Sequence, residues 1–311
     1  MLKKEEIRDW FLGLQERICT QLEAADGKGK FISDPWQRSG GGGGITRVIG
    51  EGTVIEKGGV NFSAVWGRTP EAVMKSMKLD LTDQPDFFAT GVSIVLHPFN
   101  PMVPIIHMNV RYFEMTNGTW WFGGGIDLTP HYVNVEDGRH FHKALKDVCD
   151  QHHPSYYPEF KNWADDYFYL KHRNEPRGIG GIFFDYLKDD AGFTKESRFD
   201  FIQSLGNAFG PLYIHFMAKN QSISFTEKEK QWQYLRRGRY VEFNLVWDRG
   251  TKFGLDTDGR TESILMSLPP QAQWVYNYKP EEGSEEQKTL RMLKKGIDWV
   301  SVQHSADSQK L

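Results

Sequence analysis

Short segments in which polar and apolar residues alternate constrain the fold of this chain more than any other feature. In the run from Ile106 to Phe113, a strand would place His107, Asn109 and Arg111 on one face and apolar or aromatic side chains on the other. An imidazole, an amide and a guanidinium are costly to bury without partners and well suited to an anionic ligand. This segment therefore predicts a strand whose polar face is either solvated or a binding surface.

Two other segments show the same alternation. From Ser93 to His97 these two residues share one face, and a strand predicted over 240–247 would place Asn244 and Asp248 together. A solvated sheet face usually carries Lys, Glu and Thr, so His, Asn and single Asp residues favour a cleft. The pattern alone leaves both interpretations open.

Periodicity along the rest of the chain predicts a single α+β domain over residues 1–311. Helices are predicted at 7–22 with Gly27 at its end, after Thr69 with Pro70 in the first turn, and at 136–151, 158–172, 198–219 and 286–300. Strands are predicted at 45–49, 53–56, 60–66, 91–97, 105–114, 120–128, 181–186, 240–247 and 263–268. Short connections favour antiparallel pairing, so we expect helices that cover an antiparallel sheet.

The composition excludes several classes of protein. A formal net charge of −3 gives no global footprint for nucleic acid or an anionic membrane, so an anionic partner must meet local cations. No apolar run approaches the roughly 18 residues of a membrane-spanning helix, and the N-terminus lacks the apolar segment of a signal peptide. With only Cys19 and Cys149, a disulfide scaffold is not expected, and we predict a soluble cytoplasmic protein.

Two glycine clusters each have a structural and a functional interpretation. Gly123 to Gly125 lie between aromatic residues and Asp127, where they would let a flat ligand approach the backbone, although tight sheet packing is the simpler explanation. Gly40 to Gly44 match no dinucleotide-binding fingerprint. They predict a flexible loop or, more specifically, a lid over a substrate.

Few residues are candidates for chemistry. Asp127, Asp248 and His107 could transfer protons, and Arg111 could clamp a carboxylate. These patterns predict a polar cleft for an anionic, flat or aromatic ligand and leave the reaction open.

A metal site is a further possibility. The histidines that could form one are His97, His107, His142 and His172. Their spacings match no compact metal-binding signature, and a lone histidine is more often a hydrogen-bonded structural residue. We therefore do not expect a metal.

Several long motifs resemble those of oxygen-dependent coproporphyrinogen III oxidases. They lie at 58–63, 107–113 (HMNVRYF), 120–130, 167–173, 177–185, 247–255 (WDRGTKFGL) and 262–270. The resemblance extends from about residue 6 to residue 300, which is nearly the whole chain.

This resemblance implies an activity and an assembly. The implied reaction oxidatively decarboxylates two propionates of coproporphyrinogen III to vinyl groups in haem biosynthesis, with molecular oxygen as oxidant. Its products are protoporphyrinogen IX, carbon dioxide and hydrogen peroxide. The resemblance also implies a large antiparallel sheet sandwiched between helices, a homodimer with a deep cleft in each subunit, and no flavin, haem or nicotinamide cofactor.

The resemblance also implies roles for individual residues. The positions that match substrate-binding residues are Ser93, Asn109, Arg111, Gly259 and Arg260. The neighbouring Asp258 departs from the Gly or Ser that many relatives carry.

The proton-transfer positions are implied in the same way. His107 matches a proton donor, and Asp127 and Asp248 match acids that contact pyrrole N–H groups. A carboxylate there could orient or remove a pyrrole proton. Gly40 to Gly44 fall where relatives have a mobile glycine-rich segment, which favours the lid.

Two alternatives to the oxidase stay open. A non-catalytic tetrapyrrole-binding protein on the same fold would be expected to lose Asp127, Asp248 or Arg111. A metal-dependent oxygenase would use the four histidines, which match metal ligands of bacterial relatives. We expect metal-free catalysis, because His107 cannot easily be both a metal ligand and a free proton donor. Its role stays open between proton donor, metal ligand and structural residue.

Overall fold

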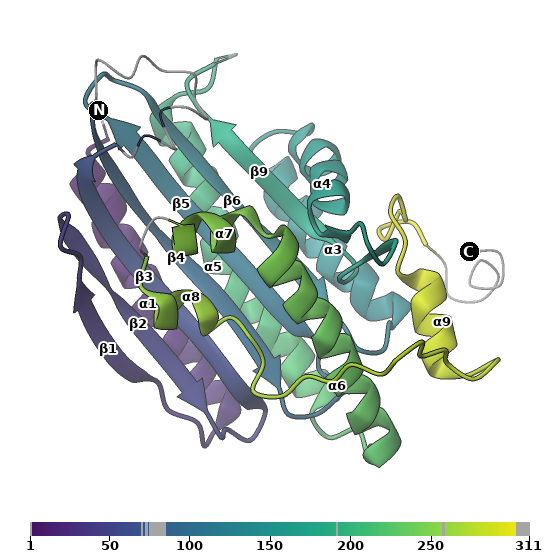
Figure 1. Ribbon diagram of the computed structural model, residues 1–311. Coiled ribbons are helices and arrows are strands. Elements are labelled where there is room, and N and C mark those ends of the chain that lie inside the picture. The colour runs from purple at the N-terminus through teal and green to yellow at the C-terminus, as the bar shows by residue number, and fades with distance from the viewer. Residues whose placement is uncertain are drawn as a thin grey trace.

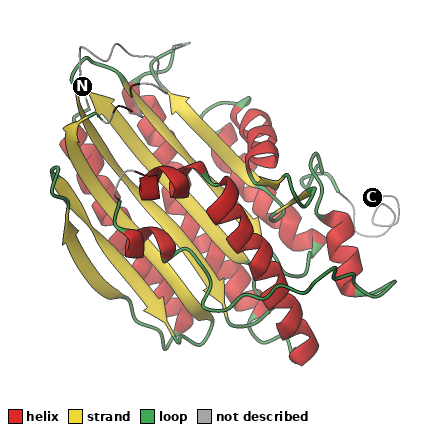
Figure 2. Cartoon of the chain, viewed as in Figure 1, coloured by secondary structure: helices red, strands yellow, loops and turns green. Residues whose placement is uncertain are grey.

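A seven-stranded antiparallel sheet dominates the computed structural model, which describes residues 2–69, 71, 74, 85–190, 192–256 and 259–302 (Figures 1 and 2). The strand order is β1-β2-β3-β4-β5-β6-β9. These strands are β1 (Ile32–Gln37), β2 (Gly42–Gly50), β3 (Ile55–Arg68), β4 (Asp86–Pro98), β5 (Ile105–Met115), β6 (Trp120–Thr129) and β9 (Gly181–Leu187). A small separate hairpin consists of β7 (Tyr169–Leu170) and β8 (Glu175–Pro176).

Helices cover both faces of the sheet, which confirms the predicted α+β architecture (Figure 1). We call one face the back face; it carries α1 (Lys4–Asp26), α3 (Val135–Asp150) and α5 (Lys195–Asn220), with α4 (Tyr156–Tyr167) alongside β9. The opposite, front face carries α6 (Glu227–Glu242), the π-helix η1 (Phe243–Trp247), α7 (Arg249–Asp256) and α8 (Thr261–Leu265). The last described helix is α9 (Glu285–Met292). No helix in the described ranges is both long and apolar enough to cross a bilayer.

The alternating sequence pattern explains the two faces. Back-facing side chains of β4, β5 and β6 are fully buried in one core with α1 and α5, and they include Val92, Ile94, Met108, Val110 and Ile126. Removing this apolar surface from water contributes about 25 cal/mol per Å² and holds the back layer to the sheet. The polar residues of the same strands consequently point to the front face.

Two predicted strands are helical in the structure. The segment 240–247 forms the end of α6 and η1, and 263–268 forms part of α8 and the turn after it. Alternation is misleading over 240–247, because Tyr240 and Phe243 are buried at helical spacing whereas Leu245 is 45% exposed.

Other boundaries also differ from the predictions. Gly42 to Gly44 belong to β2 rather than a loop; a side chain at Gly44 would lie 2.3 Å from the Phe62 carbonyl oxygen and 2.6 Å from the Trp36 ring. The helix predicted over 286–300 ends at Met292. The helix expected after Thr69 includes Pro70 and lies mostly outside the described residues.

Asp26 fastens the end of α1 to the turn before β3. Its side chain is 3% exposed and accepts backbone N–H hydrogen bonds from Gly29, Thr53, Val54 and Ile55 at 2.7 to 2.9 Å. Burial alone would raise the pKa of this carboxyl, but the N–H donors outweigh burial and hold the pKa below its usual value.

We predict that Asp26→Ala lowers the free energy of unfolding by about 3 kcal/mol at pH 7, because buried N–H groups lose their acceptor. Since the pKa of Asp26 is lowered in the folded state, its contribution is complete above the ordinary value of 3.8 and is lost as the pH falls further. The difference in free energy of unfolding between wild type and Asp26→Ala should therefore become smaller in acid. Urea unfolding at several pH values measures it.

The matched control for this prediction is Asp9→Ala on the same helix, where the carboxylate is 62% exposed. This change should cost less than about 0.5 kcal/mol. Equal losses for the two variants would contradict the role given to Asp26.

Candidate active site

The register of the sheet brings predicted site residues together on the front face. Ser93 of β4 lies opposite Asn109 of β5, which lies opposite Gly125 of β6. Two residues further along the strands, His107 lies opposite Asp127. Directly opposed residues on neighbouring antiparallel strands have side chains in contact distance. The candidate site is therefore centred on β4, β5 and β6.

A buried ion pair occupies the centre of this site. Asp127 is 1% exposed, and its carboxylate accepts two hydrogen bonds from Arg177, at 2.9 Å from Nε and 2.6 Å from Nη2. His107 Nδ1 lies 2.8 Å from Asp127 Oδ1. Burial alone would raise the pKa of Asp127, but the Arg177 charge and the His107 hydrogen bond hold it below its usual value.

Arg177 is enclosed by aromatic rings. Its guanidinium carbon lies 4.6 Å from the ring centroids of Phe168 and Phe243 and 4.7 Å from that of Tyr240. Such cation–π contacts stabilise a desolvated guanidinium. Aromatic side chains of α6, η1 and the end of α4 thus hold Arg177 in place, and Arg177 holds Asp127.

Arg177 was not among the candidates from sequence. It lies in the loop between β8 and β9, where no periodicity marks it. The only available signal is its place in the 177–185 motif, directly after Pro176. Its partner Asp127 is 50 residues away, so the pairing depends on tertiary structure.

This geometry changes what Asp127 can contact. Both of its oxygens accept hydrogen bonds from the protein, whereas the His107 side chain is 21% exposed. With Nδ1 directed at Asp127, Nε2 is the His107 nitrogen available to a ligand. The geometry therefore favours His107 as the group that contacts a ligand and Asp127 as the group that orients the His107 ring.

Arg111 lies beside this pair in a polar cluster of its own. Its Nη1 donates to Asn109 Oδ1 at 2.9 Å, and its Nη2 lies 2.9 Å from Asp185 Oδ2. The Arg111 side chain is 37% exposed, so a ligand can reach it. A side chain at Gly123 would lie 2.4 Å from Asp185 Oδ1 and 2.9 Å from Arg111 Nη2, so glycine leaves room for the ion pair.

Asp248 belongs to the front layer. Its Oδ1 accepts a hydrogen bond from the Tyr167 hydroxyl at 2.8 Å, and its Oδ2 accepts from the backbone N–H and hydroxyl of Thr251 at 2.7 and 2.8 Å. Burial and the Asp248 charge raise the pKa of Tyr167, which keeps this phenol protonated as a donor. Tyr167 stacks on Phe183 with centroids 3.9 Å apart.

The glycine cluster of β6 accommodates the protein's own side chains. A side chain at Gly125 would lie 3.1 Å from the Phe183 ring, and Gly123 accommodates the Arg111–Asp185 pair. Tight packing, the simpler of the two expectations, therefore accounts for these glycines in the structure.

The turn at Gly259 and Arg260 lies apart from this cluster. Arg260 Nη2 pairs with Asp34 Oδ2 of β1, at the opposite edge of the sheet. Asp34 is in the same row as Asn109 but four strands away, a separation of about 19 Å at the usual strand spacing. A ligand that contacts both Arg260 and the Asn109 cluster would therefore have to extend across the sheet.

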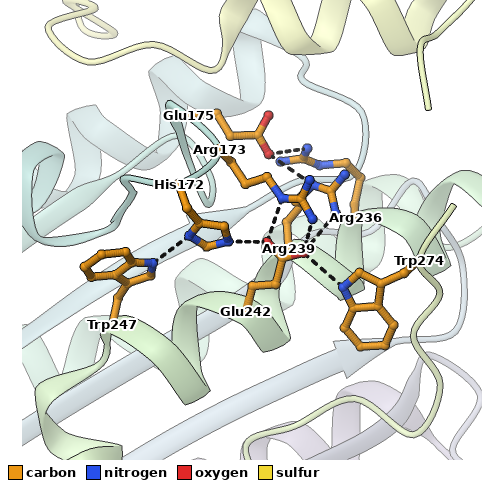
Figure 3. A network of polar contacts seen from close by, with 8 residues as sticks. All are labelled: His172, Arg173, Glu175, Arg236, Arg239, Glu242, Trp247 and Trp274. Carbon is orange, nitrogen blue, oxygen red and sulfur yellow. Dashed lines mark hydrogen bonds and ion pairs between the residues drawn. The ribbon is translucent and has the colours of Figure 1, made fainter. Parts of the chain in front are cut away.

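The four candidate metal-binding histidines lie in separate environments. His97 Nε2 lies 2.8 Å from the Ser267 carbonyl oxygen, beneath the segment that follows α8. His142 is buried in the back layer and contacts the Tyr157 hydroxyl and the Ile179 carbonyl. His172 lies between Glu242 and Trp247 (Figure 3). No group of three or more His, Cys, Asp or Glu residues in the described ranges is arranged to hold a metal ion.

Comparisons with known proteins show the family to which this chain belongs. A family model described as coproporphyrinogen III oxidase matches residues 6–299. The chain belongs to this family. Coproporphyrinogen-III oxidase 1, chloroplastic, of Arabidopsis thaliana is 50% identical over 298 residues, which cover 92% of this chain and 76% of that protein.

Two further relatives have similar coverage. The oxygen-dependent coproporphyrinogen-III oxidase of Drosophila melanogaster is 51% identical, over 92% of this chain and 76% of its own. The chloroplastic oxygen-dependent enzyme of Glycine max is 50% identical, over 92% of this chain and 77% of its own.

We predict that Arg177→Met lowers the free energy of unfolding by roughly 3–5 kcal/mol, because it leaves the buried Asp127 carboxylate unpaired. The double variant Asp127→Asn/Arg177→Met should lose less than the sum of the two single variants, since neither charge is then left alone. Chemical denaturation of the four proteins provides this double-mutant cycle. Additive losses would contradict the direct coupling.

Proposed function

We propose that this protein catalyses the oxygen-dependent decarboxylation of two propionates of coproporphyrinogen III to vinyl groups, giving protoporphyrinogen IX in haem biosynthesis. At each propionate, one O2 takes two electrons and two protons and becomes hydrogen peroxide, while the carboxylate carbon leaves as carbon dioxide. The observation that carries the proposal is the front face of this family member, where Arg111 and His107 are partly exposed beside the buried Asp127–Arg177 pair.

Arg111 would bind the reacting propionate. A guanidinium forms strong, directional hydrogen bonds with a carboxylate. Asn109 already orients this guanidinium, and Ser93 lies directly across from Asn109 on β4. Asp185 occupies one edge of Arg111, so a propionate would share this guanidinium or replace Asp185.

His107 would move a proton at the pyrrole ring next to that propionate. With its Nδ1 proton donated to Asp127, neutral His107 has Nε2 as an acceptor, and Asp127 then stabilises the imidazolium that forms. Asp127 and Arg177 are positioning residues here. Asp248, held by Tyr167 and Thr251, would supply a second carboxylate for the pyrrole N–H groups.

We also propose that no resident cofactor or metal takes part. The support is chemical: the electron-rich tetrapyrrole can itself supply the two electrons that reduce oxygen at each step. Retention of activity after dialysis against a chelator supports this proposal, and loss that added iron or manganese restores would overturn it.

We further propose that the protein acts as a cytoplasmic homodimer. The two buried cysteines, Cys19 and Cys149, are both free thiols, as suits a reducing compartment. The proposal of a dimer rests on the family resemblance. Light scattering after size-exclusion chromatography would test it by measuring the mass of the particle in solution.

The test of the reaction compares aerobic and anaerobic incubations with coproporphyrinogen III. We expect protoporphyrinogen IX only with oxygen, detected as protoporphyrin fluorescence after chemical oxidation, together with hydrogen peroxide. A folded sample that forms no oxygen-dependent product would contradict the proposed function.

The same assay tests the propionate clamp. Arg111→Ala should lower kcat/KM by about 100-fold or more, because a carboxylate partner is lost in the transition state. Arg8→Ala, which removes a 40% exposed guanidinium from α1, is the matched control and should retain activity. If Arg111→Ala stays within about threefold of wild type, the clamp assignment fails.

A further inference from the structure

Four aromatic side chains form a row across the front face, on the side of Arg111 away from His107. They come from four neighbouring strands, and we call them the aromatic row: Phe87 of β4, Phe113 of β5, Trp121 of β6 and Tyr186 of β9. Successive ring centroids lie 5.8, 4.3 and 5.2 Å apart, with interplanar angles of 6°, 27° and 35°. The row is therefore one continuous surface of contacting rings.

The sheet places the aromatic row directly beside Arg111. Phe113 follows Arg111 by two residues on β5, so both side chains point to the front face, and Trp121 lies opposite Phe113. The Arg111 guanidinium extends over Gly123, because a side chain there would lie 2.9 Å from Nη2. Trp121 is two residues from Gly123 on the same strand, which separates the two Cα atoms by about 7 Å. The Arg111 clamp and the aromatic row are therefore adjacent on one surface.

A β-bulge brings Tyr186 onto this surface. Consecutive strand residues normally point to opposite faces, yet Asp185 pairs with Arg111 and Tyr186 contacts Trp121. The two residues of β9 lie against the single residue Gly123 of β6, and Tyr186 has a φ of +53°. This backbone conformation is unusual for a residue other than glycine and carries a free-energy cost. Strain of this kind is concentrated at functional sites, which directs attention to the Tyr186 ring.

The part of the aromatic row nearest the clamp is accessible. Tyr186 is 54% exposed, and Phe113 and Trp121 are each half-buried. Phe87 is 8% exposed, and the Arg38 guanidinium lies over its ring, 5.8 Å from the centroid. The faces of aromatic rings carry partial negative charge, so they accept apolar groups and disfavour a carboxylate. The accessible part of the row is therefore suited to an apolar substituent.

The proposed reaction creates such a substituent on its own substrate. Two propionates are decarboxylated in turn, so the second step begins from a macrocycle that carries a vinyl group where the first propionate was. When Arg111 binds the second propionate, this vinyl group is on the neighbouring pyrrole ring. Its separation from the second propionate is then similar to the separation of the aromatic row from the clamp.

We propose that Phe113, Trp121 and Tyr186 bind the vinyl group of this monovinyl intermediate, so that it stays in the site for the second decarboxylation. The inference rests on the proposed function and adds an apolar subsite to the front face. These rings take no part in the chemistry at either propionate. Their loss would therefore affect the second step and the release of the intermediate, and leave the first step nearly unchanged.

The test removes the most exposed ring and measures the fate of the intermediate. Tyr186→Asn is chosen because asparagine accepts a positive φ and because the backbone N–H of residue 186 still donates to Asp185. We expect kcat/KM for coproporphyrinogen III to change less than about twofold, and kcat/KM for the isolated monovinyl intermediate to fall by about tenfold. The ratio of released monovinyl product to protoporphyrinogen IX should rise correspondingly, as measured by chromatography after chemical oxidation.

Three further variants make the test specific. Tyr186→Phe keeps the ring and should behave as wild type. Tyr276→Asn makes the matched change at a side chain that is 99% exposed in the segment after α8, and it should leave the product ratio unchanged. Trp121→Thr removes a neighbouring ring and should raise the ratio as Tyr186→Asn does, so it decides the question if Tyr186→Asn fails to fold.

The outcomes separate this inference from the proposed function. Wild-type protein that forms no oxygen-dependent product would overturn both. If wild type forms protoporphyrinogen IX, and folded Tyr186→Asn and Trp121→Thr proteins release no more monovinyl product than wild type, only the vinyl subsite is overturned. An equal fall in kcat/KM for coproporphyrinogen III and for the monovinyl intermediate would also overturn it, because the rings would then contribute to both steps.

Discussion

The arrangement of the front face depends on the buried ion pair between Asp127 and Arg177. Neither group is more than 2% exposed, and removing two charges from water carries a large desolvation cost. The cost is offset here because the pairing is bidentate, His107 adds a further hydrogen bond, and Phe168, Tyr240 and Phe243 surround the guanidinium. The pair thereby connects β6, the loop before β9, and the α6–η1 segment, which are distant in sequence.

The residues of the site fall into an enclosed group and a group that a ligand can reach. Asp127 is enclosed, whereas His107 and Arg111 project from β5 with part of each side chain exposed. Asp248 belongs to the front layer and not to the sheet, because it lies directly before α7, where Tyr167 holds its carboxylate. The site is thus formed between a sheet, which fixes register, and short helices, which close over it.

The sequence predicted the strands that carry this candidate site well and the helical segments over them poorly. Alternation on β4 and β5 identified Ser93, Asn109 and His107, because burial of one sheet face imposes a period of two. Over 240–247 the same rule was wrong, because the segment is helical: Tyr240 and Phe243 are buried at helical spacing, whereas Leu245, which alternation would bury with Phe243, is 45% exposed. Arg177 was missed, since a loop residue carries no periodic signal and its partners come from four other segments.

The long-range contacts also explain why Gly123 and Gly125 were ambiguous. Their glycine requirement comes from Asp185 and Phe183 on β9, and a sequence pattern within β6 cannot reveal those neighbours. The family resemblance implied that Gly259 and Arg260 bind substrate, but it could not show that Arg260 pairs with Asp34, far from Asn109.

The central claim is that the front face of β4, β5 and β6 binds the tetrapyrrole through Arg111. The most direct measurement is a crystal structure of the protein with coproporphyrin III, the oxidised form of the substrate, which retains all its propionates. The account predicts one propionate on Arg111 and Asn109, and a pyrrole ring within hydrogen-bond distance of His107 Nε2 or Asp248. A macrocycle bound away from this face, with Arg111 contacting only Asn109 and Asp185, would contradict it.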